Sequence, residues 1–461
     1  MMLINKEKKV SVRNKKITVI GLGLSGFEVA KLANYLGARV FVSDSGSSER
    51  VCSHAMHLMH ENHIANETGT HTDLIYESDL WIVSPGVSNK SKIILNAIER
   101  DIPIVGEIEF ASWFTDSPII AITGSNGKTT TSYILSEMCK TDNLNGILAG
   151  NMGLPFSERV LNEIKNPNAK NVFIVECSSF QMEFLHHFSP NIALYTNISP
   201  DHLDRHGSMK KYLKMKLKIS KKVDSEGFIV YNQDDIEISK RLKSLKNSVP
   251  FSAFSNDTKF RVIDNKIFGP SGSLLENVNN LGIPGEHNLS NFLAASTCAY
   301  LLGVSEDRIA NVMKNFNGIE HRLEIVRSIN DILFINDSKS TNLDSVKVAI
   351  NSFEKPIILI LGGLNKGSDF RLLLPHIKSS QVRDIVTYGD AGGHINIALG
   401  DAVRSAQVSD LNSAIKLAHS MAVPGDIILL SPGCASYDHF PNFEARGNFF
   451  RDKVNEINEN D

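Results

Sequence analysis

The sequence predicts an α/β protein built from three Rossmann-like α/β domains with mainly parallel sheets. Short apolar runs typical of buried strands alternate with helical patterns along the chain. Polar or Gly-rich turns follow these strands, as they do at the carboxyl edge of a parallel sheet. The pattern restarts twice, which predicts domains spanning residues 1–106, 107–317 and 318–461.

Length and composition are typical of a water-soluble globular protein. The chain has 461 residues, of which 42% are hydrophobic and 21% charged, and a net charge of −3. This charge gives no general attraction to nucleic acid or anionic membranes, and no apolar run approaches the roughly 18 residues that span a bilayer. Five scattered cysteines and an N-terminus without an apolar core predict reduced thiols and a cytoplasmic protein.

The first domain carries a glycine motif of the kind that binds dinucleotides. A strand at 17–20 leads into G-L-G-L-S-G at 21–26, a helix to about 36 and a strand at 39–42. Asp44 stands where an acid binds a ribose hydroxyl. NAD, the diphosphate of a UDP-sugar, and a bare scaffold remain three open interpretations. A turn at 84–87 follows the strand at 80–83, at the edge where such sheets bind ligands.

A second Gly-rich turn, T-G-S-N-G-K-T-T at 123–130, lies between an apolar strand and a helical pattern. Its glycines let backbone N–H groups approach phosphate oxygens at the positive end of a helix. Lys128 would neutralise the outer phosphates, and the Thr129 hydroxyl suits the shell of Mg²⁺. The spacing between the glycines is shorter than in the common P-loop, so an ordinary glycine turn is the alternative. The central domain is predicted to be a P-loop ATP-binding domain with a mainly parallel sheet.

Polar residues follow other strands of the central domain. Glu176 ends the strand at 172–175 and is a candidate metal carboxylate, with a capping or salt-bridged acid as the alternative. Asn288 and Asn291 stand just before an alanine-rich helix expected at 292–302, where they would bind a base or ribose. Helix capping is the alternative for Asn288.

One lysine of the segment 208–222 falls on the apolar face of the expected helix. At about 100° per residue, six lysines share the polar face. Lys216 instead lies among the apolar residues, which are Met209, Tyr212, Leu213, Leu217 and Ile219. Burying an ammonium without a partner is costly. Either the pKa of Lys216 falls, its ammonium pairs with a buried acid, or the side chain is modified. The alternative is that the side chain snorkels, with its stem on apolar surface and its ammonium in water.

Six motifs between residues 123 and 342 together resemble the ATP-dependent Mur ligases. They are T-G-S-N-G-K-T-T, E-C-S-S-F-Q, D-H-L-D, G-E-H-N-x-x-N, G-I-E-H-R-L-E and N-D-S-K-S-T-N. That family includes folylpolyglutamate synthases, so the motifs of the first and last domains must show which members this chain resembles. G-L-G-L-S-G and the run L-S-P-G-C-A-S-Y-D-x-F-x-N-F-E-x-R-G at 430–447 resemble members that act on UDP-N-acetylmuramoyl-L-alanine. The resemblance runs essentially end to end.

This resemblance implies an enzyme of peptidoglycan precursor synthesis. ATP would phosphorylate the carboxylate of UDP-N-acetylmuramoyl-L-alanine, and the amine of D-glutamate would attack the acyl phosphate, with release of ADP and phosphate. The substrate carboxylate and the phosphates of ATP are anions that must approach each other, so neutralisation of their charge by Mg²⁺ and lysine is the main catalytic need. We expect ATP, two Mg²⁺ ions and a carbamate on Lys216, in a monomer without nucleic-acid or membrane partners.

The resemblance also assigns residues, position by position. It implies Lys128 at the β- and γ-phosphates, Thr129 and Glu176 at one Mg²⁺, and His202 and carbamylated Lys216 at a second. The implied ATP site comprises Gly124, Ser125, Asn126, Gly127, Lys128, Thr129, Thr130, Asn288, Asn291, His321, Arg322, Asp337 and Lys339. The implied UDP-substrate site comprises Leu24, Ser25, Asp44, Ser45, Ser84, Gly86 and Asn151. The implied D-glutamate pocket comprises Thr341, Lys366, Ser436, Tyr437 and Phe443.

Two departures from the family pattern bear on these assignments. Tyr437 stands where leucine is common, so its contact with D-glutamate is open. The spacing from His202 to Lys216 is slightly shorter than in some members, so the lysine assignment depends on the local string and the helical face.

Three other classes of protein account for less of the sequence than a ligase of this kind. A dehydrogenase would leave the P-loop unused, a folate ligase generally lacks the first domain, and a non-catalytic nucleotide switch does not need the full set of catalytic residues. We also expect the third domain to swing onto ATP, because Asp337 and Lys339 must meet a nucleotide at Lys128.

Overall fold

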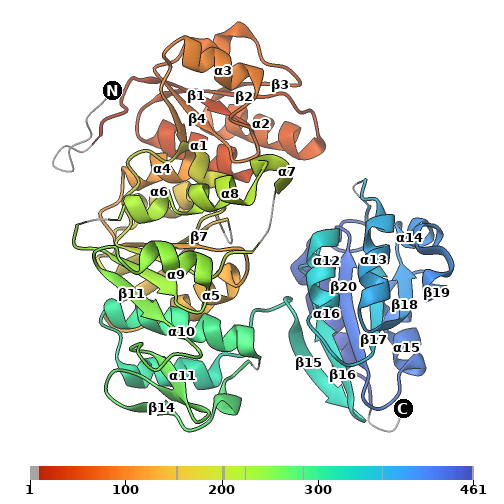
Figure 1. The fold of residues 1–461 in the computed structure, drawn as a ribbon. Coiled ribbons are helices and arrows are strands. Elements are labelled where there is room, and N and C mark those ends of the chain that lie inside the picture. The colour runs from red at the N-terminus through yellow and green to blue at the C-terminus, as the bar shows by residue number, and fades with distance from the viewer. Residues whose placement is uncertain are drawn as a thin grey trace. The chain divides into compact units, whose positions relative to one another are not determined.

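The computed structural model describes residues 10–151, 154–199, 203–223, 225–283, 285–365 and 367–458. It contains two compact units, Met1–Phe316 and Asn317–Asp461, which are described separately (Figure 1). Each unit has mainly parallel sheets covered by helices, so the predicted fold class is confirmed. Within the described residues, no helix combines the length and apolar composition needed to cross a membrane.

The first unit begins with a five-stranded parallel sheet in the order β3-β2-β1-β4-β5. Val19 and Ile82 are fully buried in this sheet, and Leu32 packs on it from the first helix. The strands are β1 (Lys16–Ile20), β2 (Arg39–Asp44), β3 (Ala65–Thr68), β4 (Leu80–Val83) and β5 (Ile104–Gly106), and the helices are α1 (Leu24–Tyr35), α2 (Glu49–Asn62) and α3 (Lys92–Glu99). The Gly-rich motif forms the turn between β1 and α1, as expected.

A second parallel sheet of the same unit has the order β11-β10-β9-β6-β8-β7. Its central strand β6 is buried throughout, and Thr123 and Ile122 at its end lie opposite Tyr195 and Glu176 of the neighbouring strands. The strands are β6 (Ile119–Thr123), β7 (Asn145–Gly150), β8 (Asn171–Glu176), β9 (Ile192–Tyr195), β10 (Phe228–Asn232) and β11 (Ser248–Phe251). The helices are α4 (Glu107–Ser112), α5 (Lys128–Met138), α6 (Phe156–Lys165), α9 (Ile236–Leu242), α10 (Glu286–Leu301) and α11 (Glu306–Asn315). The sheet thus gathers several polar strand ends at one edge.

The lysine-rich segment is shorter as a helix than expected. After α7 (Leu203–His206), helix α8 (Met209–Lys216) ends at Lys216, where we expected helix to 222. The Lys218 N–H donates to the Met215 carbonyl, three residues back, so the chain tightens there into the 3₁₀ turn Ile219–Lys221. A small antiparallel sheet of β12 (Arg261–Ile263), β13 (Lys266–Phe268) and β14 (Ser273–Leu275) follows.

The second unit is a six-stranded sheet in the order β15-β16-β20-β17-β18-β19, in which only β15 is antiparallel to its neighbour. Alternate residues of β17 face two cores: Leu359 packs with α12, α13 and α14, whereas Ile360 packs with α15 and α16. The strands are β15 (Glu324–Ile329), β16 (Ile332–Asn336), β17 (Ile357–Gly362), β18 (Val382–Tyr388), β19 (Arg404–Gln407) and β20 (Ile427–Gly433). The helices are α12 (Leu343–Ile350), α13 (Leu374–Ser379), α14 (Gly392–Leu399), α15 (Leu411–Met421) and α16 (Phe443–Asn455). Helices therefore cover both faces, as in a doubly wound fold.

The close approach of α1 to β1 gives a test of the first sheet. A Cβ on Gly26 would lie 1.8 Å from the Gly21 carbonyl oxygen, so we expect Gly26→Ala to lower the unfolding free energy of the full chain by about 1–3 kcal/mol in urea titrations. Gly23→Ala is the matched control, because a Cβ there meets nothing within 4 Å. Equal stability of the two variants would contradict the packing described.

Candidate active site

The predicted phosphate loop forms where β6 ends. The backbone bends through Gly124, with φ of +154°, and Gly127, with φ of +79°, before α5 begins at Lys128. A Cβ on Gly124 would lie 1.9 Å from Thr196 Oγ1, and one on Gly127 would lie 2.3 Å from Asn291 Oδ1. Both positions therefore require glycine, and the loop presents backbone at a helix N-terminus, as phosphate binding requires.

Two lysines donate to the same carbonyl of this loop. Lys128 Nζ lies 2.9 Å from the carbonyl oxygens of Gly124 and Ser125. Lys216 Nζ lies 2.7 Å from the Gly124 oxygen and 4.8 Å from the centre of the Tyr212 ring. Lys216 is 2% exposed, so the predicted burial is confirmed and the snorkelling alternative is wrong. Two lysine side chains therefore meet at the phosphate loop, where the charge of Lys128 would stabilise anionic phosphates.

Glu176 is hydrogen-bonded both to the helix after the phosphate loop and to the turn after β7. Its Oε2 accepts a hydrogen bond of 2.9 Å from Thr129 Oγ1, and its Oε1 accepts one of 2.9 Å from Asn151 Nδ2. The Glu176 carboxylate is buried at the end of β8. Within the described structure it neither caps a helix nor forms an ion pair. A hydroxyl and a carboxylate are oxygen ligands of the kind Mg²⁺ prefers.

The second predicted metal ligand, His202, lies outside the described residues. In the part of the chain that the structure describes, no three His, Cys, Asp or Glu side chains gather closely enough to hold a metal. Of the predicted metal set, the structure therefore brings together Thr129 and Glu176 and places Lys216 on the same loop.

Asn291 lies against the helix that follows the phosphate loop. Its Oδ1 accepts from Thr131 Oγ1 at 3.2 Å, and its Nδ2 donates to Asn288 Oδ1 at 3.4 Å. Helix α10 begins at Glu286, earlier than the expected 292, and its cap is Gly285. The capping interpretation of Asn288 is therefore wrong, and both asparagines lie in the first turns of the helix, beside the loop.

All but one of the predicted UDP-substrate residues lie at the carboxyl edge of the first sheet. Asp44 accepts from the Leu22 and Gly46 N–H groups at 2.5 and 2.7 Å, so its carboxylate braces the Gly-rich turn. Ser84 Oγ donates to the Gly21 carbonyl at 2.9 Å. Four others occupy the same turns: Leu24 and Ser25 at the start of α1, Ser45 after β2 and Gly86 after β4. Asn151 instead follows β7 of the second sheet, where it donates to Glu176.

The turn after β4 is also tied to the second sheet of the same unit. Arg205 donates from Nη2 to the Val87 carbonyl at 3.3 Å and forms a two-pronged ion pair with buried Glu183. A small hollow between Pro85 and Phe184 is lined by Glu107, whose pKa burial raises to about 7. The turn after β4 is therefore joined to α7 and to the segment 181–184 that follows β8.

In the second unit, the predicted nucleotide residues surround the end of β16. His321 is buried and lies edge-on to the ring of Phe443. Lys339 Nζ lies 5.7 Å from the centre of the Phe443 ring. Asp337 is buried and accepts from the hydroxyls of Ser340 and Ser431 at 2.5 and 2.8 Å. Burial raises the pKa of Asp337 to about 6, although these hydrogen bonds oppose the rise. Arg322 is half-buried beside this group.

The predicted D-glutamate residues differ in exposure. Ser436 is buried, Thr341 is exposed and Tyr437 is 62% exposed, whereas Lys366 lies outside the described residues. The structure thus leaves a large aromatic surface at Tyr437, where a leucine is common in the family.

Two buried side chains of this unit were missed by the sequence reasoning. Arg446 is fully buried and donates to the Ser338 hydroxyl and carbonyl and to the Cys434 carbonyl, at 2.8–3.1 Å. Arg446 lies four residues before Phe450 on α16, so a helical wheel of this segment places both residues on the buried face. Asn336 ends β16, and no sequence pattern distinguishes it from a turn residue.

Comparison with known proteins places the chain in a family. Three family models match it: the MurD N-terminal domain over residues 16–93, the Mur ligase middle domain over 122–299 and the Mur ligase glutamate ligase domain over 321–434. The chain belongs to the Mur ligase family.

Relatives that share one name match the chain along nearly its whole length. UDP-N-acetylmuramoylalanine–D-glutamate ligase of Christiangramia forsetii is 35% identical, with 96% of this chain and 100% of the relative covered. The protein of that name from Thermoanaerobacter pseudethanolicus is 38% identical, with coverages of 97% and 100%. The chain is therefore similar to these ligases in all three regions matched by the family models.

Solved structures share the fold at low sequence identity. UDP-N-acetylmuramate–alanine ligase MurC of Thermotoga maritima has a TM-score of 0.52 at 20% identity, covering 96% of this chain and 99% of that chain. The MurF ligase of the same organism, solved in complex with ADP, has a TM-score of 0.54 at 13% identity, with coverages of 98% and 97%. These likenesses establish the fold.

The raised pKa of Asp337 predicts a pH-dependent stability. A carboxyl whose folded pKa lies near 6 stabilises the fold below its unfolded pKa, and this contribution is lost as pH rises through about 6. The unfolding free energy of the wild type, relative to Asp337→Asn, should therefore fall by about 3 kcal/mol between pH 4 and pH 7. Urea titrations of the full chain measure it, with exposed Asp390→Asn as the control. Parallel pH curves for wild type and Asp337→Asn would contradict the assignment.

Proposed function

We propose that this chain joins D-glutamate to UDP-N-acetylmuramoyl-L-alanine in peptidoglycan precursor synthesis. As a Mur ligase it is an ATP-dependent amide ligase. The observation that carries the choice of substrates is the end-to-end match, first region included, to relatives named UDP-N-acetylmuramoylalanine–D-glutamate ligase. The geometry of the phosphate loop and Glu176 supports the same chemistry.

The phosphate loop is suited to bind ATP and Mg²⁺. ATP, when bound, supplies the phosphoryl group that turns a poor carboxylate electrophile into an acyl phosphate, and Mg²⁺ offsets the charge of the phosphates. Lys128 would leave its two carbonyl partners to contact the outer phosphates. The buried hydroxyl–carboxylate pair of Thr129 and Glu176 fits a Mg²⁺ site, with Asn151 holding the second carboxylate oxygen. His202 is proposed as a ligand of the second ion.

Lys216 is proposed to carry a carbamate. Its amine is buried beside the phosphate loop, where a free ammonium is costly to hold and where an anionic oxygen would suit a metal. Carbamylation joins the neutral amine to carbon dioxide with loss of a proton, so it replaces the buried positive charge with a negative one. The Gly124 carbonyl remains in reach of the nitrogen.

The two ends of the substrate pair are proposed to occupy different units. The turns at Asp44 and Ser84 would hold the uridine diphosphate, and Ser436, Thr341 and Lys366 would hold the carboxylates of D-glutamate. Asp337 and Lys339 belong to the second unit and Lys128 to the first. If all three contact one ATP, the units must close on it during the reaction.

A phosphate-release assay tests the proposed reaction. Purified full chain is incubated with ATP, Mg²⁺ and UDP-muramoyl acceptors, together with D-glutamate, L-glutamate, L-alanine or L-lysine in turn. We expect rapid release only with D-glutamate and UDP-N-acetylmuramoyl-L-alanine. Release with another amino acid would overturn the substrate assignment, and no release with any pair would overturn the ligase assignment.

Glu176→Gln tests the Mg²⁺ site. The amide keeps the size and one acceptor oxygen but loses the charge, so we expect the Mg²⁺ concentration for half-maximal phosphate release to rise and kcat to fall by about 10²-fold. Glu137→Gln, near the far end of α5 and paired with Lys140, is the matched control. Unchanged Mg²⁺ dependence in Glu176→Gln would remove Glu176 from the site.

The carbamate has a test independent of catalysis. Full chain equilibrated with ¹³C-bicarbonate should give one protected carbamate signal by NMR, which Lys216→Ala removes and Lys214→Ala, on the exposed side of α8, retains. Activity should fall when carbon dioxide is excluded and return when bicarbonate is added. A wild-type protein without the signal would contradict the modification.

A further inference from the structure

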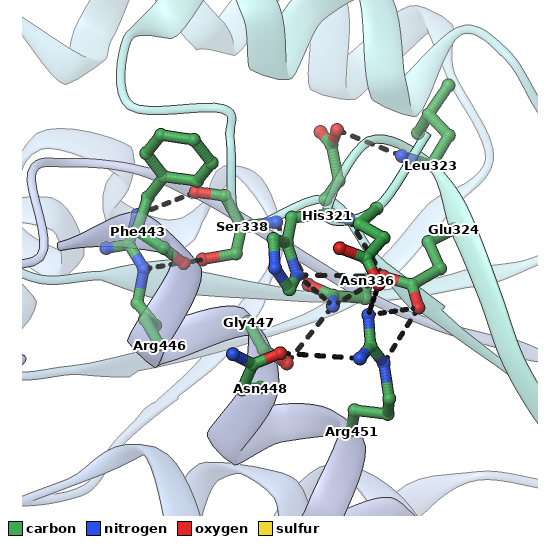
Figure 2. Close-up of polar contacts among 12 residues, drawn as sticks. His321, Leu323, Glu324, Asn336, Ser338, Phe443, Arg446, Gly447, Asn448 and Arg451 are labelled. Carbon is green, nitrogen blue, oxygen red and sulfur yellow. Dashed lines mark hydrogen bonds and ion pairs between the residues drawn. The ribbon is translucent and has the colours of Figure 1, made fainter. Parts of the chain in front are cut away.

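The amide of Asn336 has only one orientation that satisfies its neighbours. Its Nδ2 lies 2.9 Å from Glu324 Oε2 and 3.1 Å from the Gly447 carbonyl oxygen, and its Oδ1 accepts from the Ser338 N–H at 3.2 Å (Figure 2). Exchanging the nitrogen and oxygen would set oxygen against two acceptors and NH₂ against a donor. Arg451 Nε and Nη2 lie 2.9 and 2.7 Å from Glu324 Oε1, so the other oxygen, Oε2, faces the amide.

This orientation fixes the proton of His321. Asn336 Nδ2 lies 3.0 Å from His321 Nδ1. The two hydrogens of this NH₂ are shared among three acceptors, which are Nδ1, Glu324 Oε2 and the Gly447 carbonyl. Because an amide NH₂ only donates, a proton on Nδ1 would point at it, so Nδ1 accepts and carries no proton. A neutral imidazole has one N–H, so the proton is on Nε2. Among the described residues, no hydrogen-bond partner of Nε2 is found, which leaves that N–H for a ligand.

The surroundings of the His321 ring lower its pKa on balance. Burial lowers the pKa of His321, and the charge of Arg451 lowers it further. The carboxylates of Glu324, Glu320 and Glu444 act in the opposite direction. Glu324 Oε2 is 3.6 Å from Nδ1, so it would become the partner of a protonated ring if the amide of Asn336 were absent.

Helix α16 prevents the ring from moving away from the amide. A Cβ on Gly447 would lie 2.2 Å from His321 Nδ1 and 2.7 Å from its Cγ, so the helix backbone touches the ring face. The edge of the Phe443 ring limits the other side, with the centroids 6.2 Å apart. The ring is therefore held in place by α16 and oriented by β16.

We propose that Asn336 is a positioning residue that holds His321 neutral with its proton on Nε2, so that the ring offers an N–H donor to an oxygen of the bound nucleotide. The tautomer follows from the hydrogen-bond geometry alone, and only the identity of the acceptor rests on the proposed function. A ring with its proton on Nδ1 would offer an acceptor instead and would repel the same oxygen.

The tautomer is measured by two-bond ¹H–¹⁵N correlation on full chain labelled at histidine nitrogen. The His321 signal is assigned by its loss in His321→Gln. At pH 7 we expect the pattern of a neutral ring protonated on Nε2. A neutral ring protonated on Nδ1, or a doubly protonated ring, in the wild type would overturn the proposal, and this arm needs no variant of Asn336.

Two variants separate positioning from simple support of the fold. Asn336→Asp replaces the donor by an acceptor, so Nδ1 should gain a proton and the pKa of His321 should rise by about one unit or more. Asn336→Ala removes the donor, so the fixed tautomer should become a mixture. Asn351→Asp, which adds the same charge at the exposed end of α12, should leave the spectrum unchanged. An unchanged His321 spectrum in both Asn336 variants would contradict the positioning role.

Binding of a non-hydrolysable ATP analogue with Mg²⁺, followed by calorimetry, tests the nucleotide contact. We expect Asn336→Ala to bind it about tenfold more weakly than wild type, because a positioned donor is lost. Equal affinity would overturn the contact with nucleotide. If the wild type shows the expected tautomer and binds the analogue but has no ligase activity, the result counts against the proposed function alone.

Discussion

The carbonyl oxygen of Gly124 is the point on which the site of the first unit depends. It accepts from Lys128 and from buried Lys216, and it belongs to a backbone turn that no Cβ can enter. The carbonyl lets two lysine nitrogens lie at one loop, and the glycines let that loop lie against Thr196 and Asn291. A phosphate chain bound there would meet the charge of Lys128 already in place, which is how preorganised sites stabilise anions.

The second unit follows a similar physical rule with different groups. Asp337, His321 and Arg446 are ionisable side chains buried around the end of β16, and each is held by hydrogen bonds to hydroxyl, amide or carbonyl groups. Such networks are costly when incomplete and rigid when complete. They keep the loops after β16 and β20 in fixed positions, where the proposed nucleotide and D-glutamate contacts lie.

Local pattern was sufficient to predict the fold class, the two glycine turns and the burial of Lys216, because each depends on spacing along one strand or helix. The end of α8 at Lys216 and the early start of α10 were not predicted, since they depend on hydrogen bonds within single turns. Asn336 depends on a partner far along the chain, Gly447, so no local pattern marks it. The antiparallel strand β15 was also not predicted, although it is local: it pairs with β16 across the two-residue turn of Asn330 and Asp331. The boundary at 106/107, the monomeric state and the cytoplasmic location stay predictions.

Transfer of an oxygen isotope tests the central claim most directly. UDP-N-acetylmuramoyl-L-alanine labelled with ¹⁸O in its alanyl carboxylate is incubated with the enzyme, ATP, Mg²⁺ and D-glutamate, and the phosphate released is analysed by mass spectrometry. Activation of the carboxylate by phosphorylation predicts one ¹⁸O atom in each phosphate released, together with formation of the amide. Amide formation with unlabelled phosphate would contradict the acyl-phosphate route, and labelled acceptor recovered without amide would contradict the ligase itself.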